Sequence, residues 1–166
     1  MQETTVILDH KAITHKIKRM AYQVYESNVN EEEVIIAGIM DNGYVLAQKI
    51  KAQVQKISPI KVRLCKVHID KKQPTNTIST SIPLEEFKDQ SLVLVDDVLH
   101  SGTTLIYGVK HFLEVPLKQF KTAVLVDRNH KKYPVKADFK GISLSTSIKE
   151  RVVVEFTKEE TNAYLL

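Results

Sequence analysis

One thirteen-residue stretch decides the fold: VLVDDVLHSGTTL, residues 93–105. Its apolar beginning predicts a buried strand, and a helical pattern over residues 103–114 begins directly after Gly102. The N-terminus of a helix presents unpaired backbone N–H groups and a partial positive charge, which favour a phosphate group. Asp96 and Asp97 would repel that phosphate, but they can accept hydrogen bonds from sugar hydroxyls or hold Mg²⁺ through water. The stretch therefore predicts a site for a phosphorylated sugar.

Short apolar runs alternate with helical patterns on both sides of this stretch. Strands are predicted over residues 34–37, 60–64, 91–95 and 123–126, with shorter ones near 137–139 and 151–156, and helices over residues 9–26, 44–54 and 103–114. Residues 71–87 are polar and predict a mobile loop. This alternation is typical of an α/β fold with a mostly parallel sheet flanked by helices on both faces. Ligands of such sheets bind beyond the carboxyl ends of the strands, where each motif falls.

Length and composition favour one cytoplasmic domain. The chain has 166 residues with 24 Lys+Arg and 20 Asp+Glu, and we expect a single domain over residues 1–166. The net charge of +4 is too small to indicate a nucleic-acid partner by itself. The single cysteine, Cys65, fits a reducing compartment and excludes an internal disulfide. Residues 34–40 form the longest apolar run, too short to span a membrane, and residues 1–5 lack the pattern of a signal peptide. We therefore expect no membrane partner.

The acidic and glycine-containing segment resembles the phosphoribosyl pyrophosphate (PRPP) signature of the type I phosphoribosyltransferases. The resemblance implies that family's fold, with residues 65–87 as the flexible hood loop that covers PRPP. It also implies Mg²⁺, bound through PRPP, Asp96 and Asp97, and it assigns these two acids as the catalytic residues, which hold the ribose hydroxyls. The PRPP-binding residues that it implies are Asp96, Asp97, Val98, Leu99, His100, Ser101, Gly102, Thr103 and Thr104.

The flanking segments are similar to the bifunctional pyrimidine-operon attenuator/uracil phosphoribosyltransferase proteins, over residues 6–9, 123–130, 133–139 and 150–154. This likeness implies pyrimidine salvage, in which uracil and PRPP give UMP and pyrophosphate, and a homodimer or larger homo-oligomer. It places His100, Arg128 and Val152 at the nucleobase. Purine-using relatives usually carry an acid at the position of His100, so His100 disfavours a purine. Two alternatives stay open: His100 as a partly solvated loop residue, and Arg128 as a surface partner of Asp127 or Asp138.

The family's pyrophosphate loop corresponds to Met40, Asp41, Asn42 and Gly43. Family members present backbone N–H groups there, often with a basic residue, whereas this chain has Asp41 and Asn42. A carboxylate near pyrophosphate is unfavourable unless Mg²⁺ lies between them, since like charges repel at short range. The segment predicts either a pyrophosphate loop with weakened turnover or an ordinary Asp-Asn-Gly turn.

A basic face is predicted on the first helix, opposite its apolar stripe. It gathers Lys11, His15, Lys18, Arg19 and Tyr22, a combination suited to single-stranded RNA but also found on any solvated helix face. By resemblance, the candidate RNA-binding residues are Lys18, Arg19, Lys131 and Lys136. Two rival functions therefore remain beside uracil transfer: a catalytically weak, nucleotide-sensing RNA attenuator of a pyrimidine leader, and a phosphoribosyltransferase for another base.

Overall fold

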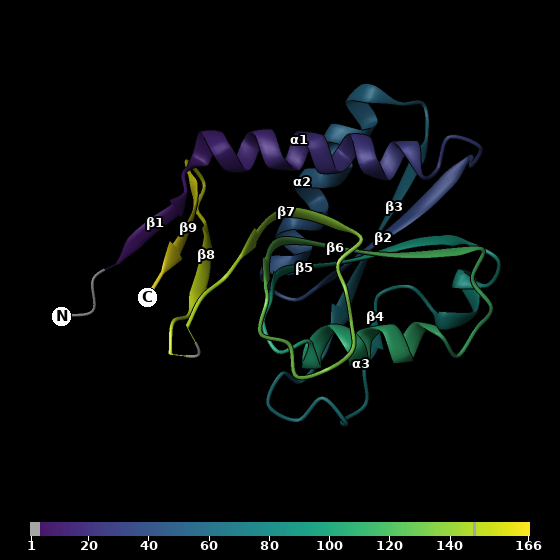
Figure 1. Cartoon of the computed structure of the whole chain (residues 1–166). Helices are drawn as coiled ribbons and strands as arrows, with labels where there is room; N and C mark the ends of the chain where they lie inside the picture. The colour runs from purple at the N-terminus through teal and green to yellow at the C-terminus, as the bar shows by residue number, and fades with distance from the viewer. Residues whose placement is uncertain (1–3, 148) are drawn as a thin grey trace.

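The fold is built on two β-sheets in a computed structural model that describes residues 4–147 and 149–166. The first three residues of the segment tested above for a signal peptide lie outside the described residues. The central sheet has the strand order β4-β3-β2-β5-β6-β7, and a smaller antiparallel sheet has the order β1-β9-β8 (Figure 1). The central strands are β2 (Glu33–Ile39), β3 (Lys61–His68), β4 (Ser79–Thr80), β5 (Ser91–Leu99), β6 (Gln119–Arg128) and β7 (Phe139–Leu144). All of them pair in parallel except β4, which confirms the mostly parallel sheet.

Helices cover both faces of the central sheet, as predicted. The helices α1 (His10–Glu26) and α2 (Asn42–Ile57) lie on one face, and α3 (Thr103–Phe112) lies on the other (Figure 1). The helix α1 begins where the sequence predicts, because the Asp9 carboxylate accepts a hydrogen bond of 2.8 Å from the backbone N–H of Ala12. Its apolar stripe faces the sheet, so the opposite, basic face is left to solvent.

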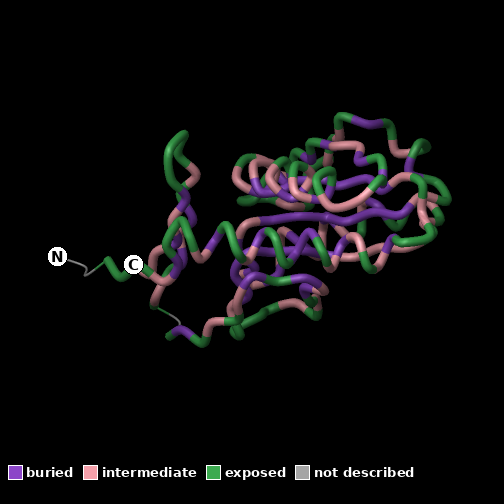
Figure 2. Tube along the Cα trace, turned by 90° about the horizontal axis from the view of Figure 1, so that it is seen from above, coloured by how far each residue is buried: buried purple, intermediate pink, exposed green. Residues whose placement is uncertain are grey.

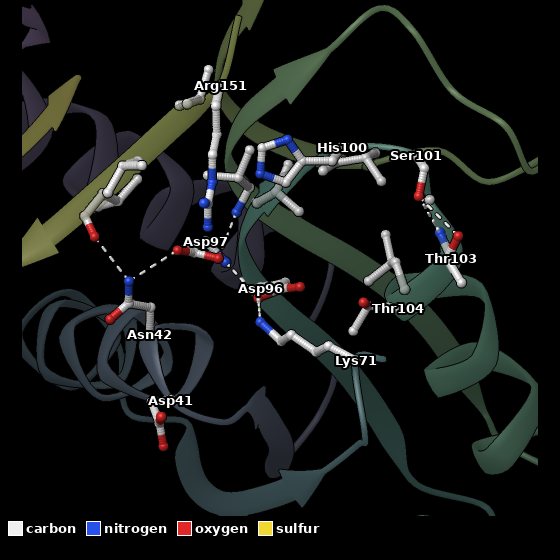
Figure 3. Close-up of a pocket in the computed structure, with 18 residues that line it drawn as sticks. Asp41, Asn42, Lys71, Asp96, Asp97, His100, Ser101, Thr103, Thr104 and Arg151 are labelled. Carbon is white, nitrogen blue, oxygen red and sulfur yellow. Dashed lines mark hydrogen bonds and ion pairs between the residues drawn. The ribbon is translucent and has the colours of Figure 1, made fainter. Parts of the chain in front are cut away.

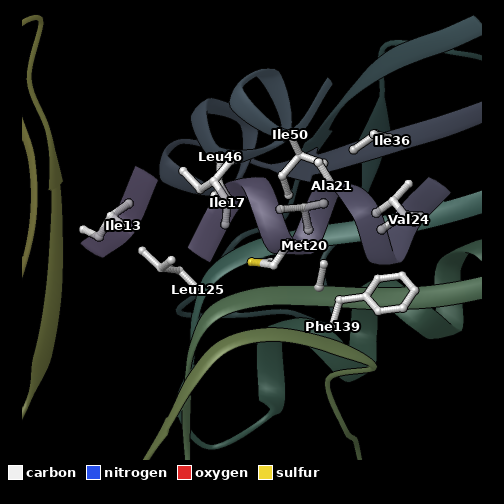
Figure 4. Close-up of a cluster of buried hydrophobic side chains, with 14 of the residues drawn as sticks. Ile13, Ile17, Met20, Ala21, Val24, Ile36, Leu46, Ile50, Leu125 and Phe139 are labelled. Carbon is white, nitrogen blue, oxygen red and sulfur yellow. The ribbon is translucent and has the colours of Figure 1, made fainter. Parts of the chain in front are cut away.

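Apolar clusters fill both interfaces between helices and sheet. Figure 4 shows Ile17, Met20 and Val24 of α1 packed with Ile50 of α2 over the central strands. Successive side chains of β2 pack into hydrophobic clusters on opposite faces of the sheet. Ile36 packs against α1 and α2, and its neighbour Ile35 packs on the face that α3 covers. The buried central strands are visible in Figure 2. A sheet buried on both faces is a rigid base for the loops that follow its strands.

The polar segment over residues 71–87 has more structure than the mobile loop predicted for it. It contains β4 and a 3₁₀ helix, η1 (Leu84–Phe87). Phe87 is fully buried, and its ring centroid lies 4.9 Å from that of Phe112. Elements of two and four residues are too short to show a period in the sequence, so this prediction was wrong for residues 79–87.

Other boundaries differ from the sequence predictions by a few residues. The helix α2 begins two residues earlier than expected, at Asn42, and α3 ends at Phe112. The strand β6 continues to Arg128, so Asp127 lies within a strand that the sequence predicted to end at residue 126. The small sheet consists of β1 (Thr5–Leu8), β8 (Val152–Phe156) and β9 (Thr161–Leu165), of which only β8 was predicted. The strands β1 and β9 are partly exposed, and their apolar runs are shorter than those of β2 and β5.

Candidate active site

A cavity of about 370 Å³ lies beyond the carboxyl end of β5, between the N-terminal ends of α2 and α3 and the strand β8 (Figure 3). The structure brings all nine residues of the predicted PRPP signature, from Asp96 to Thr104, into its wall. Asp41, Asn42 and Val152 also line it, whereas Met40, Gly43 and Arg128 do not. Lys71, for which the sequence favoured a solvated charge over a pyrophosphate contact, lines it too. Arg151 also lines it, although the sequence did not single it out as a site residue. The sequence did contain one indication that Arg151 lies at the site: it directly precedes Val152, which was predicted to lie at the nucleobase.

The two acids at the end of β5 differ in their surroundings. Asp96 is buried, with 4% of its surface exposed, and Asp97 is half-buried. The Oδ1 atom of Asp96 accepts a hydrogen bond of 2.9 Å from the backbone N–H of Asp97 and lies 3.9 Å from Lys71 Nζ. Burial, reinforced by the Asp97 charge and opposed by Lys71, raises the pKa of Asp96 to about 8. Asp96 therefore keeps its proton at neutral pH.

Asn42 ties the start of α2 to both sheets. Its Nδ2 atom donates to Asp97 Oδ2 over 3.0 Å and to the backbone oxygen of Val154 in β8 over 2.9 Å (Figure 3). Asn42 and Gly43 belong to the first turn of α2, so residues 41–43 do not form a separate turn. A Cβ atom on Gly43 would lie 2.7 Å from the backbone oxygen of Val95, so only glycine lets α2 approach β5 this closely. Asp97, the predicted sugar-binding acid, and the first turn of α2 are thus held in one hydrogen-bonded unit.

The turn between β5 and α3 has the geometry of a phosphate cradle. Gly102 adopts a left-handed conformation with φ of 87°, which glycine tolerates at no steric cost. The hydroxyl oxygens of Ser101 and Thr103 are 2.8 Å apart, and the backbone N–H groups of Lys132 and Tyr133 donate to the Ser101 carbonyl. Residues 132–133 therefore hold the turn from outside. Within the turn, the Thr103 N–H donates to Ser101 Oγ over 3.3 Å, and the N-terminus of α3 behind it is the kind of position that favours an anion.

Gly102→Ala is expected to lower the free energy of unfolding by about 1–3 kcal/mol, because an L-residue is strained at this φ. The added Cβ would also lie 2.6 Å from Val135 Cγ1. Urea unfolding measures the change, with Ser101→Ala as the control that alters the same turn without backbone strain. Equal stability of Gly102→Ala and the natural protein would contradict the left-handed turn.

His100 follows the end of β5, is partly buried, and is held by Arg128. Arg128 Nη1 lies 3.0 Å from His100 Nδ1, and its Nε donates to Thr146 Oγ1 over 2.8 Å. Arg128 pairs with neither of the acids considered above among the described residues, and it sits behind His100, outside the cavity wall. Burial and the Arg128 charge lower the pKa of His100 below its usual value. The structure thus brings His100 and Val152 into the cavity wall, whereas Arg128 contacts His100 from behind that wall.

The predicted basic face is exposed, but much of its charge has partners within the chain. Arg19 Nη2 donates to the backbone oxygens of Lys140 and Gly141, over 2.8 and 2.7 Å. Lys131 Nζ is 3.1 Å from Asp127 Oδ1, and Lys136 Nζ is 3.4 Å from Asp138. The exposed side chains of α1 that carry this face are those of Lys11, His15, Lys18, Arg19 and Tyr22. Arg19 joins α1 to β7, a structural role that the sequence alone did not reveal.

Metal-binding groups and membrane helices were also sought among the described residues. Within residues 4–147 and 149–166, no three His, Cys, Asp or Glu side chains gather in a way that could hold a metal ion. In the same part of the chain, no helix has the length and apolar character needed to cross a bilayer. Cys65 is buried, as expected of a small core residue.

Comparisons with known proteins agree with this site. The family described as "Phosphoribosyl transferase domain" matches residues 3–159. "Bifunctional protein PyrR" of Clostridium kluyveri is 32% identical over 95% of this chain and 93% of its own length. The protein of the same name from Bacillus subtilis is 30% identical over 98% of this chain and 95% of its own length. The crystal structure of the hypoxanthine phosphoribosyltransferase of Trypanosoma cruzi has a TM-score of 0.77 at 13% identity, covering 90% of this chain and 85% of that one. At so low an identity this last likeness shows a shared fold alone.

Proposed function

This chain belongs to the phosphoribosyltransferase family, and from that premise we propose that it transfers ribose 5-phosphate from PRPP to uracil. The products are UMP and pyrophosphate, as in pyrimidine salvage. The observation that carries the proposal is the cavity in which the acids Asp96 and Asp97 face the phosphate cradle of α3. The similarity to proteins named "Bifunctional protein PyrR", which pair pyrimidine regulation with uracil transfer, supports uracil as the base.

The chemistry requires positioning more than covalent help. The bond between ribose C1′ and the pyrophosphate oxygen breaks, the bond from C1′ to uracil N1 forms, and the N1 proton is released. Positive charge develops on the ribose ring, where the Asp97 carboxylate stabilises it and accepts a hydroxyl hydrogen bond. The 5′-phosphate is held by the hydroxyls of Ser101, Thr103 and Thr104 and by the N-terminal N–H groups of α3. His100 and Val152 border the base.

Phosphoribosyltransferases generally use Mg²⁺ together with PRPP, and the residues present fit this ion. Asp96 and Asp97 supply carboxylate oxygens, the donors that Mg²⁺ prefers. Asp41 also lines the cavity, at the predicted pyrophosphate loop, where its charge needs a cation between it and the leaving group. When bound, Mg²⁺ neutralises charge on the departing pyrophosphate. We therefore propose Mg²⁺ as the cofactor.

The direct test is to mix the protein with PRPP, Mg²⁺ and one base at a time, and to measure nucleotide formation by chromatography. The bases are uracil, cytosine, orotate, hypoxanthine and guanine. We expect UMP to form fastest. No UMP at any uracil concentration would refute the transferase, and faster turnover of another base would support the rival phosphoribosyltransferase.

A second function follows from the exposed basic face of α1. We propose that this face, extended by Lys131 and Lys136, binds the leader RNA of a pyrimidine operon and that UMP bound in the cavity adjusts the affinity. The exposure of Lys11, His15 and Lys18 supports this interpretation, because side chains without internal partners are available to phosphates. We also propose a cytoplasmic homo-oligomer, whose size light scattering can measure.

Lys18→Glu is expected to weaken RNA binding about three- to tenfold at 0.1 M salt and to reduce the salt slope by more than one. The measurement is filter binding over a salt series, with Lys88→Glu as a matched charge reversal on the exposed segment after η1. Arg19→Glu is a poorer probe, because it also removes the hydrogen bonds to the Lys140 and Gly141 carbonyls. Equal RNA affinities of Lys18→Glu and Lys88→Glu would exclude this face as the RNA site.

A further inference from the structure

The contacts of Arg128 fix where His100 carries its proton. A guanidinium group has five N–H donors and no acceptor, and it stays charged in proteins. Its Nη1 lies 3.0 Å from His100 Nδ1, so that nitrogen has to be the acceptor and cannot carry a proton. The neutral ring then holds its single proton on Nε2. We infer that His100 recognises the nucleobase as an Nε2–H donor and that Arg128 is the positioning residue that keeps it one. This inference rests on the proposed transfer to a base.

The surroundings of His100 favour the neutral ring. His100 is partly buried at the end of β5, and both burial and the Arg128 charge lower its pKa. The other charged groups that face it are Arg151 and Lys71, which act in the same direction, and Asp97, which opposes them. A second proton on Nδ1 would also point directly at the guanidinium. The neutral imidazole ring of His100 therefore has a single N–H donor, on Nε2, and carries no positive charge.

Arg128 is itself immobilised, so the arrangement does not depend on a free surface side chain. Its Nε donates to Thr146 Oγ1 over 2.8 Å, and its Nη2 donates to the Ser147 carbonyl over 3.1 Å. Thr146 is buried, with 6% of its surface exposed. The fork of the guanidinium thus joins the end of β6 to the segment after β7, and its remaining edge meets His100. A lysine in this place has no such fork.

The free side of His100 faces the cavity. No hydrogen bond found among residues 4–147 and 149–166 uses its Nε2, and Figure 3 shows the ring extending over the cavity toward Arg151. An N–H donor there accepts a base that presents a carbonyl oxygen, as uracil does at both of its oxo positions. An exocyclic amino group is itself a donor, so cytosine or adenine presenting that edge would leave two N–H groups unpaired. The selected class is therefore an oxo base.

Nucleotide binding tests this selection without requiring catalysis. Calorimetry with UMP and CMP is expected to show that the natural protein prefers UMP by about ten- to one-hundred-fold. His100→Phe should abolish the preference, and His100→Gln, whose amide keeps an N–H donor, should retain part of it. Arg128→Gln should reduce the preference, whereas Arg63→Gln, which affects a surface pair with Glu33 and Glu86, should not. Equal affinities for UMP and CMP in the natural protein, or no binding of either, would overturn the inference.

Nitrogen NMR tests the role of Arg128 directly. Two-bond ¹H–¹⁵N correlations of the ligand-free protein at pH 7 should show His100 as the Nε2–H tautomer, and Arg128→Gln should show a mixture of tautomers or a charged ring. A natural protein with the proton on Nδ1 would refute the inference even if UMP is formed. Conversely, a protein that forms no UMP but discriminates UMP from CMP, and shows the Nε2–H tautomer, would contradict the transferase and uphold the inference.

Discussion

Asp97→Asn is expected to lower kcat/KM for UMP formation by about 10²–10³-fold, the loss typical of removing one preorganised group that stabilises transition-state charge. Asp97 is half-buried and lines the cavity. The substitution replaces its carboxylate with a neutral amide at the position where positive charge develops on ribose. It also places an amide opposite Asn42 Nδ2, which now donates to Asp97 over 3.0 Å.

The measurement is steady-state kinetics with PRPP and uracil varied, together with circular dichroism to check the fold. Asp89→Asn is the matched control, since Asp89 is exposed, lies outside the cavity wall and has a positive φ of 59°, which asparagine tolerates. We expect this control to keep its activity. A loss below tenfold in Asp97→Asn would exclude Asp97 from stabilising the transition state.

Asp96→Asn is expected to stabilise the folded protein above pH 8 by several kcal/mol, at about 1.4 kcal/mol for each unit of raised pKa, while it destroys the PRPP site. The pKa of Asp96 is about 8 in the folded protein, against the ordinary aspartate value of 3.8. Between these two values the folded state binds more protons than the unfolded state, so the free energy of unfolding falls as pH rises from about 4 to 8. The loss of folding free energy caused by ionising Asp96 is therefore absent at pH 4 and complete above pH 8.

An asparagine resembles the protonated acid at every pH, so the variant should gain nothing at pH 4 and most at pH 8.5. Urea unfolding at pH 4 and pH 8.5 measures the difference in free energy of unfolding between Asp96→Asn and the natural protein. For the control Asp89→Asn, this difference should be the same at the two pH values. A constant difference between Asp96→Asn and the natural protein at the two pH values would contradict the raised pKa. This gain would also mean that the natural protein keeps a buried acid for function at the expense of stability.

The sequence predicts the site best where its chemistry is local. The strand, the two acids and the glycine turn follow one another in residues 93–105, and the structure brings Asp96 to Thr104 into one cavity wall. The contact between Arg128 and His100 could not be predicted, because the two residues are 28 positions apart and only the parallel pairing of β5 with β6 brings them together. The contacts of Arg19 with β7 were missed for the same reason, since they join residues more than 120 positions apart. The spacing of residues within one helix or strand does not reveal contacts between elements that lie far apart in the sequence.

The small sheet was largely missed because its signal is divided between the two ends of the chain. Thr5 of β1 pairs with Leu165 of β9, and both strands are short and partly exposed. Neither therefore has the continuous apolar run that made β2 and β5 evident. The interior of the central sheet could be predicted from the sequence, whereas the pairing of these distant strands could not.

The double contact of Asn42 limits which residues evolution can place at position 42. One primary amide serves two acceptors that belong to different sheets, the carboxylate of Asp97 and the main chain of Val154. Serine and threonine have one donor each, and aspartate has none when ionised. A change here would therefore release Asp97 and the main chain of β8 in a single mutational step. Compensating changes to a substitution at position 42 should then arise together in Asp97 and β8.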